Sequence, residues 1–402
     1  MTSHDPARER LLIAVTSLGH FLCHLGELTF MGVMLAVKDE FGLDPAHTAV
    51  LPMLGFVLMG VGGLPVGVWA DWWGPARVLQ IYFLAMAVAG CLVALSTNVW
   101  TLFASLTLLG LALSVYHPVG LALLATAKAH GRAMGINGVA GSVGVAAGPL
   151  LGFVAAALGW WRGAFLVLAG LSLLGAGWMG FAWRRLDSAA RLTASTKLPA
   201  GVECGLWRRS LPMILLSLSM LLGGFNYRCL VTTLPAYCRS GEEVVLILLL
   251  GGCVGQFFGG WAIDRFGSWV YPLFIGLLAP CGLVLAVAQG SPTGTLVATL
   301  LAFNLFAQQP VENALLARWT PRGRAGLSYG TKIALTFGFG ALGSLVTGLI
   351  WDAAGTPAPV FFLFAATATV MVLLVVAALR LRRLLERSAA PPEPALEAAP
   401  VA

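Results

Sequence analysis

Apolar stretches long enough to cross a lipid bilayer recur along the whole chain of 402 residues. A helix needs about 20 such residues to span a hydrocarbon core of about 30 Å. The stretches are continuous instead of alternating, which favours helices over a transmembrane barrel. Charged residues make up only 10% of the chain, against about 25% in a typical soluble domain. The sequence therefore predicts an all-α integral membrane protein.

The apolar stretches define twelve expected transmembrane helices. They lie at residues 11–36, 48–70, 76–96, 100–126, 133–158, 163–183, 211–236, 244–263, 270–289, 294–317, 325–350 and 358–380. The first stretch contains ionisable residues and lacks a small-residue cleavage pattern, so we interpret it as a membrane span and not as a signal peptide.

The distribution of Lys and Arg predicts the orientation of the chain. With the N-terminus inside, nineteen of these residues flank the cytoplasmic ends of the spans, and only Lys38, Arg162 and Arg239 flank the outer ends. Such a bias is typical of cytoplasmic loops. We therefore expect both termini on the cytoplasmic side of a bacterial-type inner membrane. The net charge of +7 then reflects these loops and does not indicate nucleic-acid binding.

One polar linker divides the twelve spans into two sets of six. We assign residues 1–186 to an N-terminal half, 187–209 to a cytoplasmic linker, 210–383 to a C-terminal half and 384–402, which are rich in Pro and Ala, to a disordered tail. The halves share landmarks at a nearly constant offset: Asp71 and Asp264 are 193 residues apart, while Gly131 with Gly323 and Pro118 with Pro310 are each 192 apart. This register predicts two related halves.

A Gly-x-x-x-Asp loop follows the second span of each half. The first copy contains Gly67, Asp71 and Gly74, and the second contains Gly260, Asp264 and Arg265. Glycine lets two helices approach closely, and aspartate at a helix end can bind a cation or cap a neighbouring helix. The loop resembles the signature of the major facilitator superfamily. This resemblance implies two six-helix halves around a central substrate site, with a latch that closes the cytoplasmic side in one state. Trp72 replaces the usual basic residue of the first copy, and Arg77 is the nearby cation.

A second motif, Gly144, Gly148, Pro149 and Gly152, lies in the fifth span. Small residues four apart permit close helix packing, and proline loosens the backbone where bending would help switching. The motif resembles a pattern of antiporter branches of the superfamily, which favours export.

The first half also resembles a narrower group, the fosmidomycin-resistance-type drug efflux permeases. The matching residues are Ser17 and His20 in the first span, His117 and Pro118 in the fourth, and the Gly131-Arg132 loop. Tyr116 stands where that group has phenylalanine. The resemblance implies the fold, whereas the substrate need not transfer with it.

Seven ionisable residues remain inside the expected spans, where a charged Arg, Lys or Asp costs about 2.5–3.5 kcal/mol to insert. They are His20, His24, Glu27, His117, Arg228, Glu312 and Lys332. The spacing of His20, His24 and Glu27 places them on one helical face, as does that of Asn304, Gln308 and Glu312. In the superfamily that the chain resembles, the first, fourth, seventh and tenth helices line the cavity, so six of the seven residues would face it.

These residues have candidate roles in transport. Glu27, Glu312 and His117 are candidate proton carriers; His20, His24, Tyr116, Arg228, Gln308, Gln309, Asn313 and Lys332 are candidates for substrate binding. The guanidinium of Arg228 offers a planar fork for a carboxylate or phosphonate. Structural alternatives stay open: Glu27–Arg228 and Glu312–Lys332 ion pairs, a packing role for His24, and donation by His117 to a carbonyl that Pro118 leaves free.

The sequence assigns no metal site and no cofactor. The three membrane histidines lie on two helices with no established common centre, the seven cysteines form no metal-binding spacing, and no nucleotide-binding loop is present.

The leading hypothesis is a monomeric secondary transporter for proton-coupled efflux of a small polar or anionic compound. An importer or siderophore transporter on the same fold remains an alternative. A non-transporting assembly factor or membrane-embedded enzyme is a second, although no reactive constellation supports it. The expected partners are a small-molecule substrate, protons and the lipid bilayer.

Overall fold

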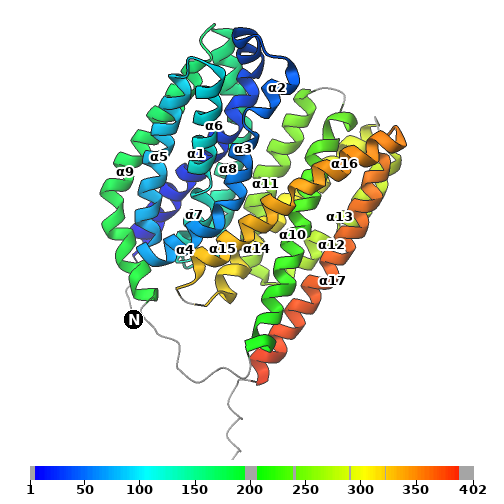
Figure 1. Ribbon diagram of the computed structural model, residues 1–402. Coiled ribbons are helices and arrows are strands. Elements are labelled where there is room, and N and C mark those ends of the chain that lie inside the picture. Colours follow the sequence, from blue (N-terminus) through cyan, green and yellow to red (C-terminus); the bar gives the residue numbers. More distant parts are fainter. Residues whose placement is uncertain (1–4, 195–205, 239–240, 289–290, 322, 389–402) are drawn as a thin grey trace, which may run out of the picture.

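A computed structural model describes residues 5–194, 206–238, 241–288, 291–321 and 323–388, and these residues are almost entirely helical (Figure 1). The N-terminal half contains α1 (Pro6–Phe41), α2 (Pro45–Val50), α3 (Met53–Val61), α4 (Gly63–Trp73), α5 (Pro75–Ala94), α6 (Val99–Leu113), α7 (Tyr116–Leu124), α8 (His130–Ala157) and α9 (Arg162–Ala194). The C-terminal half contains α10 (Leu206–Tyr237), α11 (Gly241–Phe266), α12 (Val270–Gly276), α13 (Leu278–Val287), α14 (Pro292–Trp319), α15 (Ala325–Ile333), the π-helical segment η2 (Ala334–Phe339), α16 (Ala341–Ala354) and α17 (Ala358–Ser388).

Within the described residues, eleven of the twelve expected spans are apolar enough to cross a membrane. Ten are single candidate spans, and α3 with α4 forms an eleventh that is bent by 46°. The twelfth is α14, which is long enough at 28 residues but carries several polar side chains. Asn304, Gln308 and Glu312 are at most 3% exposed, so these polar groups face other helices and not lipid.

Several expected spans are broken helices. The second consists of α3 and α4, which meet at Gly62 and Gly63, and the fourth consists of α6 and α7, which meet at Ser114. A Cβ on Gly62 would lie 2.7 Å from the Ser114 hydroxyl oxygen, so the two breaks pack against each other. Glycine pairs are a known cause of sharp kinks. The eleventh span is interrupted by η2.

The expected linker and tail fall partly outside the described residues. Helix α9 runs to Ala194 and α10 begins at Leu206, so helices enter the expected linker of residues 187–209 from both sides. Residues 195–205 lie outside the described part of the chain, as do residues 389–402 of the expected tail.

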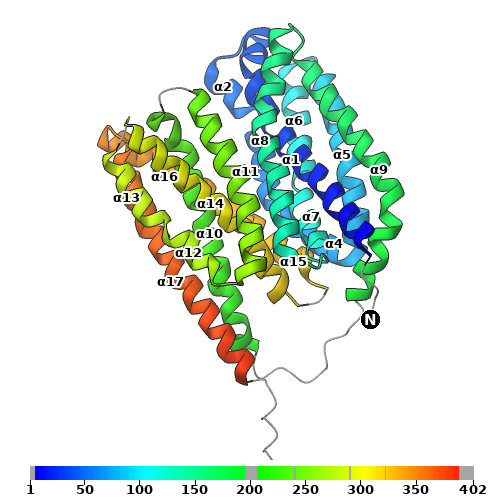
Figure 2. The same ribbon diagram turned by 180° about the vertical axis from the view of Figure 1, so that it is seen from behind.

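The two halves pack together along two related seams. In one, α4 lies against α15, and in the other α11 lies against α8. A Cβ on Gly67 would collide with the carbonyl oxygen of Gly326, and one on Gly131 would collide with that of Gly260. Both ends of the described chain lie at the lower end of the molecule, where α4, α7 and α15 gather in both views (Figures 1 and 2). At both seams the helix backbones touch, and glycine, which has no Cβ, is required for that contact.

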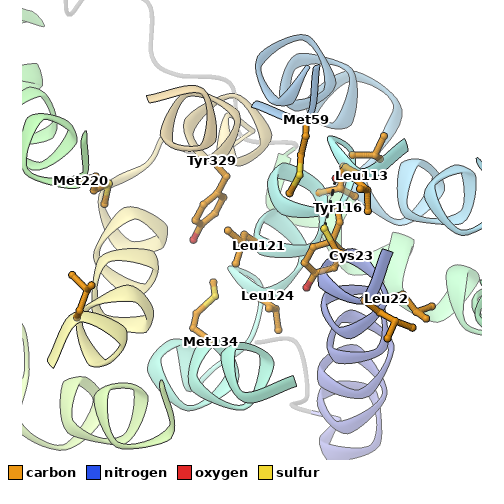
Figure 3. Packing of buried hydrophobic residues seen from close by; sticks show 14 of the residues in the cluster. Leu22, Cys23, Met59, Leu113, Tyr116, Leu121, Leu124, Met134, Met220 and Tyr329 are labelled. Atoms are coloured by element: carbon orange, nitrogen blue, oxygen red, sulfur yellow. Dashed lines mark hydrogen bonds between the residues drawn. The ribbon is translucent and has the colours of Figure 1, made fainter. Parts of the chain in front are cut away.

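An apolar layer fills the space between the seams. Tyr329 of α15 is fully buried and points toward Leu121 of α7 and Met134 of α8 (Figure 3). Its hydroxyl donates to the backbone carbonyl of Asn313 at 2.8 Å. The layer closes the lower end of the bundle with side chains from both halves.

The glycine motif of α8 packs against α1. A Cβ on Gly148 would lie 2.9 Å from the carbonyl oxygen of Leu25, and Cβ atoms on Gly144 and Gly152 would crowd the carbonyl oxygens of Phe21 and Thr29. Pro149 lies inside α8, which continues through it. Close packing against the helix that carries His20, His24 and Glu27 is thus one structural role of this motif.

Candidate functional site

Two polar clusters lie inside the bundle, one in each half. We call the first the histidine cluster; it consists of His20, His24 and Glu27 on α1 and His117 on α7. We call the second the acid–lysine cluster; it consists of Tyr271 on α12, Glu312 and Asn313 on α14, and Lys332 on α15. Between them, the clusters contain six of the seven ionisable residues identified in the expected spans. The seventh, Arg228, lies on α10.

The histidine cluster is a chain of short contacts. The Nδ1 atom of His24 lies 2.7 Å from Oε2 of Glu27. Its Nε2 atom lies 3.2 Å from Nε2 of His20. The Nδ1 atom of His20 donates to the backbone carbonyl of Asn137 at 2.8 Å. Each histidine on α1 therefore uses Nδ1 to anchor itself and turns Nε2 toward the other.

His117 completes the cluster from a second helix. Its ring centroid lies 5.2 Å from that of His20 and 5.3 Å from that of His24. One ring nitrogen from each of the three histidines lies within 4.8 Å of the others. The Nε2 atom of His117 is buried and has no hydrogen-bond partner. The sequence offered no common centre for these histidines, but the structure provides one.

Tyr116 supports the cluster from α7. Its ring stacks on His20 with centroids 5.0 Å apart. Its hydroxyl donates to the backbone carbonyl of Thr16 and accepts from the Asn137 amide, both at 2.8 Å. Tyr116 therefore supports one face of the His20 ring, and its own hydroxyl is bonded to Thr16 and Asn137.

The acid–lysine cluster contains a buried ion pair. The ammonium of Lys332 lies 2.9 Å from Oε2 of Glu312, and the two side chains are 8% and 4% exposed. Lys332 also donates to the Asn313 amide oxygen at 2.6 Å, and the Tyr271 hydroxyl donates to Oε1 of Glu312 at 2.7 Å. Both carboxylate oxygens have a donor, as a buried charge requires.

Arg228 lies near the histidine cluster and does not form the direct pair with Glu27 that the sequence left open as an alternative. Glu27 bonds to His24 instead, and Arg228 attracts it electrostatically from a greater distance. The guanidinium carbon of Arg228 lies 6.0 Å from the ring centroid of Phe337, and Phe337 also packs on His117. Arg228 is half-buried, so the positive charge lies beside the polar centre.

The glutamines of α14 complete the polar surface. The Gln308 side chain is 2% exposed, and its Oε1 atom is buried without a hydrogen-bond partner. Gln309 accepts a hydrogen bond from Gln256 of α11 at 2.7 Å. Gly223 of α10 leaves room for this face, because a Cβ there would lie 3.4 Å from Nε2 of Gln308.

The two loop aspartates each cap a helix of the other half. Asp71 accepts from the backbone N–H groups of Gly326 and Leu327 at 2.7 and 2.8 Å. Asp264 accepts from those of Gly131 and Arg132 at 3.0 and 2.7 Å. We call these two contacts the aspartate latches. Of the two roles expected for these aspartates, both residues show the capping role, and Asp264 also binds a cation, Arg318.

The capped helices have no side-chain cap of their own. The residues before α8 and α15 are Ala129 and Arg324, and neither makes a capping hydrogen bond through its side chain. The first N–H groups of a helix lack partners and carry partial positive charge, so each aspartate supplies a missing cap to the opposite half. The local sequence of each helix is therefore incomplete without the other half.

The cations of the two loops have different contacts. The guanidinium carbon of Arg77 lies 5.6 Å from the Trp183 ring centroid of the same half. That of Arg265 lies 5.9 Å from the Phe266 ring. The cation that bonds to Asp264 is Arg318, at 3.3 Å.

Three site residues were not among the candidates that the sequence singled out. Asn137 orients both His20 and Tyr116, Gln256 bonds to Gln309, and Tyr271 bonds to Glu312. All three are polar side chains in apolar segments, and each is at most 5% exposed. Extending the candidates to every polar side chain within the expected spans would have found them.

Comparison with known proteins identifies the family. The family model of the major facilitator superfamily matches residues 16–243 and 240–402, which together cover most of the chain. The chain belongs to the major facilitator superfamily. It is thus a multi-span membrane transporter and not an enzyme, and its fold is the all-α, twelve-helix arrangement of two six-helix halves expected from the sequence.

Individual relatives are distant. The chain is 26% identical over 292 residues to an uncharacterized MFS-type transporter, YfnC of Bacillus subtilis (strain 168), covering 66% of this chain and 68% of the relative. Among solved structures, it resembles the human organic anion transporter MFSD10 (TM-score 0.72, 18% identity, 92% of this chain and 100% of the other). It also resembles the proton:xylose symporter XylE (TM-score 0.75, 13% identity, 93% and 96%). The E. coli fucose:proton symporter FucP has a TM-score of 0.69 at 13% identity, covering 91% of this chain and 98% of the other. At these identities the likeness shows the fold alone.

Proposed function

We propose that this protein is a proton-coupled secondary transporter that exports a small polar or anionic compound by alternating access. The observation that supports the coupling is the buried Glu312–Lys332 pair, with an N–O distance of 2.9 Å. An ion pair inside a membrane protein is costly to maintain and marks transport sites in many cases.

The acid–lysine cluster offers a simple coupling chemistry. While Glu312 is ionised, its carboxylate holds Lys332. A proton on Glu312 neutralises the carboxylate and leaves the ammonium available for an anionic group of the substrate. Other polar groups near the carboxylate are the Tyr271 hydroxyl, which Ser219 contacts at 3.4 Å, and the Gln308 amide, which shares the neighbour Gly223 with Glu312. These groups carry no formal charge, so Lys332 is the partner whose charge Glu312 controls.

The aspartate latches support alternating access. They join the halves at one end of the bundle through hydrogen bonds that the other state must break. In the proposed orientation this end faces the cytoplasm of a bacterial-type inner membrane, so the structure represents a state closed to the cytoplasm. Labelling a Ser188→Cys variant with an impermeant thiol reagent tests the orientation. We expect reaction only after the membrane is permeabilised, and reaction in intact cells contradicts the orientation.

The solved neighbours support the substrate class only by their names. One is an organic anion transporter, and two are proton symporters of sugars. An anionic substrate also suits the exposed side of Arg228, whose guanidinium can bind a carboxylate in bidentate fashion. Export rests on the glycine–proline motif of α8 and the resemblance to fosmidomycin-resistance-type permeases. The sequence prediction that Glu27 and His117 also carry protons remains a prediction, and the present proposal does not depend on it.

Glu312→Gln tests the coupling in proteoliposomes, with a panel of organic anions and sugars as substrates. Glutamine keeps the shape but cannot cycle a proton, so we expect loss of pH-driven accumulation while exchange of substrate across the membrane at equal pH continues. The matched control is Glu386→Gln, which alters a carboxylate bonded to Arg382 at the exposed end of α17. If the Glu312 variant still accumulates substrate along a proton gradient, the coupling residue lies elsewhere.

The same vesicles separate export from the import alternative. In vesicles with the Ser188 side sealed inside, an exporter extrudes substrate when protons flow inward. Uptake together with protons would instead support an importer, including one for a siderophore.

A further inference from the structure

We propose that His20, His24 and His117 bind one divalent transition-metal ion, such as Zn²⁺ or Co²⁺, through their ring nitrogens. The inference rests on the geometry of the histidine cluster and goes beyond the proposed function. No cysteine is required, and Glu27 and Asn137 act behind the ligands.

The orientation of the two α1 histidines leaves two lone pairs facing each other. Nδ1 of His20 must carry hydrogen, because its partner is a carbonyl oxygen. Nδ1 of His24 bonds to a carboxylate, which is also an acceptor when ionised. In neutral rings both Nε2 atoms are then acceptors, yet they lie only 3.2 Å apart. Something positive is needed between them.

A shared proton satisfies that contact but leaves His117 unexplained. One extra proton on the Glu27–His24–His20 chain allows one Nε2 atom to donate to the other. The Nε2 atom of His117 remains buried without a partner, on a side chain that is only 7% exposed. A buried polar atom without a partner is unfavourable, because it has lost its hydrogen bonds to water. A metal ion satisfies all three rings at once.

The spacing suits a tetrahedral ion. Zn–N bonds of about 2.0–2.1 Å place two ligand nitrogens of a tetrahedron about 3.3 Å apart, close to the 3.2 Å between His20 and His24. The three ring nitrogens lie within 4.8 Å of one another, so His117 must move closer by at most about 1.5 Å to reach the tetrahedral spacing. Three protein nitrogens leave the fourth position for water or an anion.

The groups behind the histidines are those that metal ligands use. A ligating histidine usually donates its other N–H to a carbonyl or a carboxylate, which fixes the ring and its tautomer. His20 has the Asn137 carbonyl and His24 has Glu27. Of the two cations near the cluster, Lys332 is held by Glu312 and Arg228 is attracted by Glu27. Their charges are therefore partly compensated.

The test is Co²⁺ binding to the full chain, purified in detergent through a tag that contains no histidine. We expect one Co²⁺ per protein by elemental analysis, with the intense visible bands of four-coordinate Co²⁺ and no sulfur charge-transfer band. His117→Gln should weaken binding by at least tenfold. Glu27→Gln should weaken it by about 10–100-fold, the usual effect of removing a group behind a ligand.

Two histidines serve as matched controls. His47 bonds to Asp44 at the surface, and His130 bonds to the Ala125 carbonyl. His47→Gln and His130→Gln should bind Co²⁺ as the parent does. Equal binding by these controls and by His117→Gln contradicts the proposal, as does a parent that retains no Co²⁺, which would favour the shared proton.

A measurement on the parent alone covers the case in which His117→Gln does not fold. X-ray absorption of the Zn²⁺-loaded protein should show three imidazole ligands at about 2.0–2.1 Å. A spectrum with sulfur ligands or with oxygen ligands only would overturn the assignment.

Discussion

The two polar clusters occupy related halves but balance their charges differently. In the acid–lysine cluster, Lys332 bonds to Glu312 and Asn313, and Tyr271 bonds to the remaining carboxylate oxygen. In the histidine cluster, the Nε2 atoms of His20 and His24 face each other, and neither receives a hydrogen bond while both rings are neutral. The Nε2 atom of His117 has no hydrogen-bond partner. The charges of the acid–lysine cluster therefore balance within the cluster, whereas the histidine cluster requires an additional proton or metal ion. The duplicated features are the aspartate latches, whereas the centres have diverged, which fits a shared switching mechanism with separate chemical roles.

The largest expected effect comes from removing one side of the compensated cluster. Lys332→Met leaves the Glu312 carboxylate buried without its cation, which costs about 3–5 kcal/mol for a buried pair. The double variant Lys332→Met/Glu312→Gln removes both charges and should recover most of that loss. Thermal unfolding in one detergent measures both variants. A double variant no more stable than Lys332→Met contradicts the assignment of the unpaired buried carboxylate as the cause.

A single substitution in the histidine cluster should cause a smaller loss of stability in the same thermal-unfolding measurement. His24→Gln removes a ring that carries no required charge, so we expect about 1–3 kcal/mol, the cost of an unsatisfied buried polar group. A loss as large as that of Lys332→Met would show that the histidine cluster already holds a full charge. The difference between the stability losses of Lys332→Met and His24→Gln therefore measures how differently the two clusters balance their charges.

The sequence predicted the features that depend on local periodicity. Apolar lengths located the spans, and helical spacing placed His20, His24 and Glu27 on one face. The constant offset paired Asp71 with Asp264. Apolar length also placed residues 294–317 in the membrane, and helical spacing put Asn304, Gln308 and Glu312 on one face of that helix.

The contacts between distant segments could not be predicted from the same patterns. Which backbone N–H groups Asp71 would cap depends on how α4 approaches α15, and the sequence does not specify that geometry. The convergence of His117 with His20 likewise depends on where α7 begins after the break at Ser114. The sequence left a Glu27–Arg228 pair open as an alternative, but His24 lies three residues from Glu27 on the same helix and bonds to it instead.

Substitutions at the seams between the halves should cause the next largest loss of stability. Gly67→Val places a side chain where the carbonyl oxygen of Gly326 lies, and overpacking of this kind costs about 1–3 kcal/mol. In the alternating-access mechanism proposed above, the other state separates these helices, so we expect the closed state to lose population. The matched control is Gly177→Val on α9, where a Cβ meets nothing within 4 Å.

Spin labels on the two halves can measure this change. Trp72 on α4 and Phe266 on α11 are 83% and 61% exposed at the closed end. Labels there should move apart in the Gly67 variant and keep the parental distance in the Gly177 variant. An unchanged distance in both would show that α4 and α15 can absorb the added side chain.

The smallest expected effect distinguishes the two latches. Asp71→Asn keeps one oxygen that can accept a hydrogen bond at the start of α15, but its NH₂ group then faces the second backbone N–H group. The substitution also removes the negative charge, which the N-terminal end of a helix stabilises. We expect a loss of about 0.5–2 kcal/mol in the closed state. Asp264→Asn loses the same cap on α8 and also the contact with Arg318, which at 37% exposure contributes little, about 0.2–1 kcal/mol.

The two variants should therefore open the same end to slightly different extents. A change of 1.4 kcal/mol shifts a two-state equilibrium about tenfold, so the labels at residues 72 and 266 can resolve each variant from the parent. We expect the longer-distance population to be larger for Asp264→Asn than for Asp71→Asn, and high salt should reduce the difference because the Arg318 contact is exposed. If Asp71→Asn opens the bundle more, the α4–α15 seam carries the tighter latch, and the ion pair with Arg318 does not stabilise closure. That result would make the N-terminal half dominant in switching, although its loop lacks the basic residue of the family pattern.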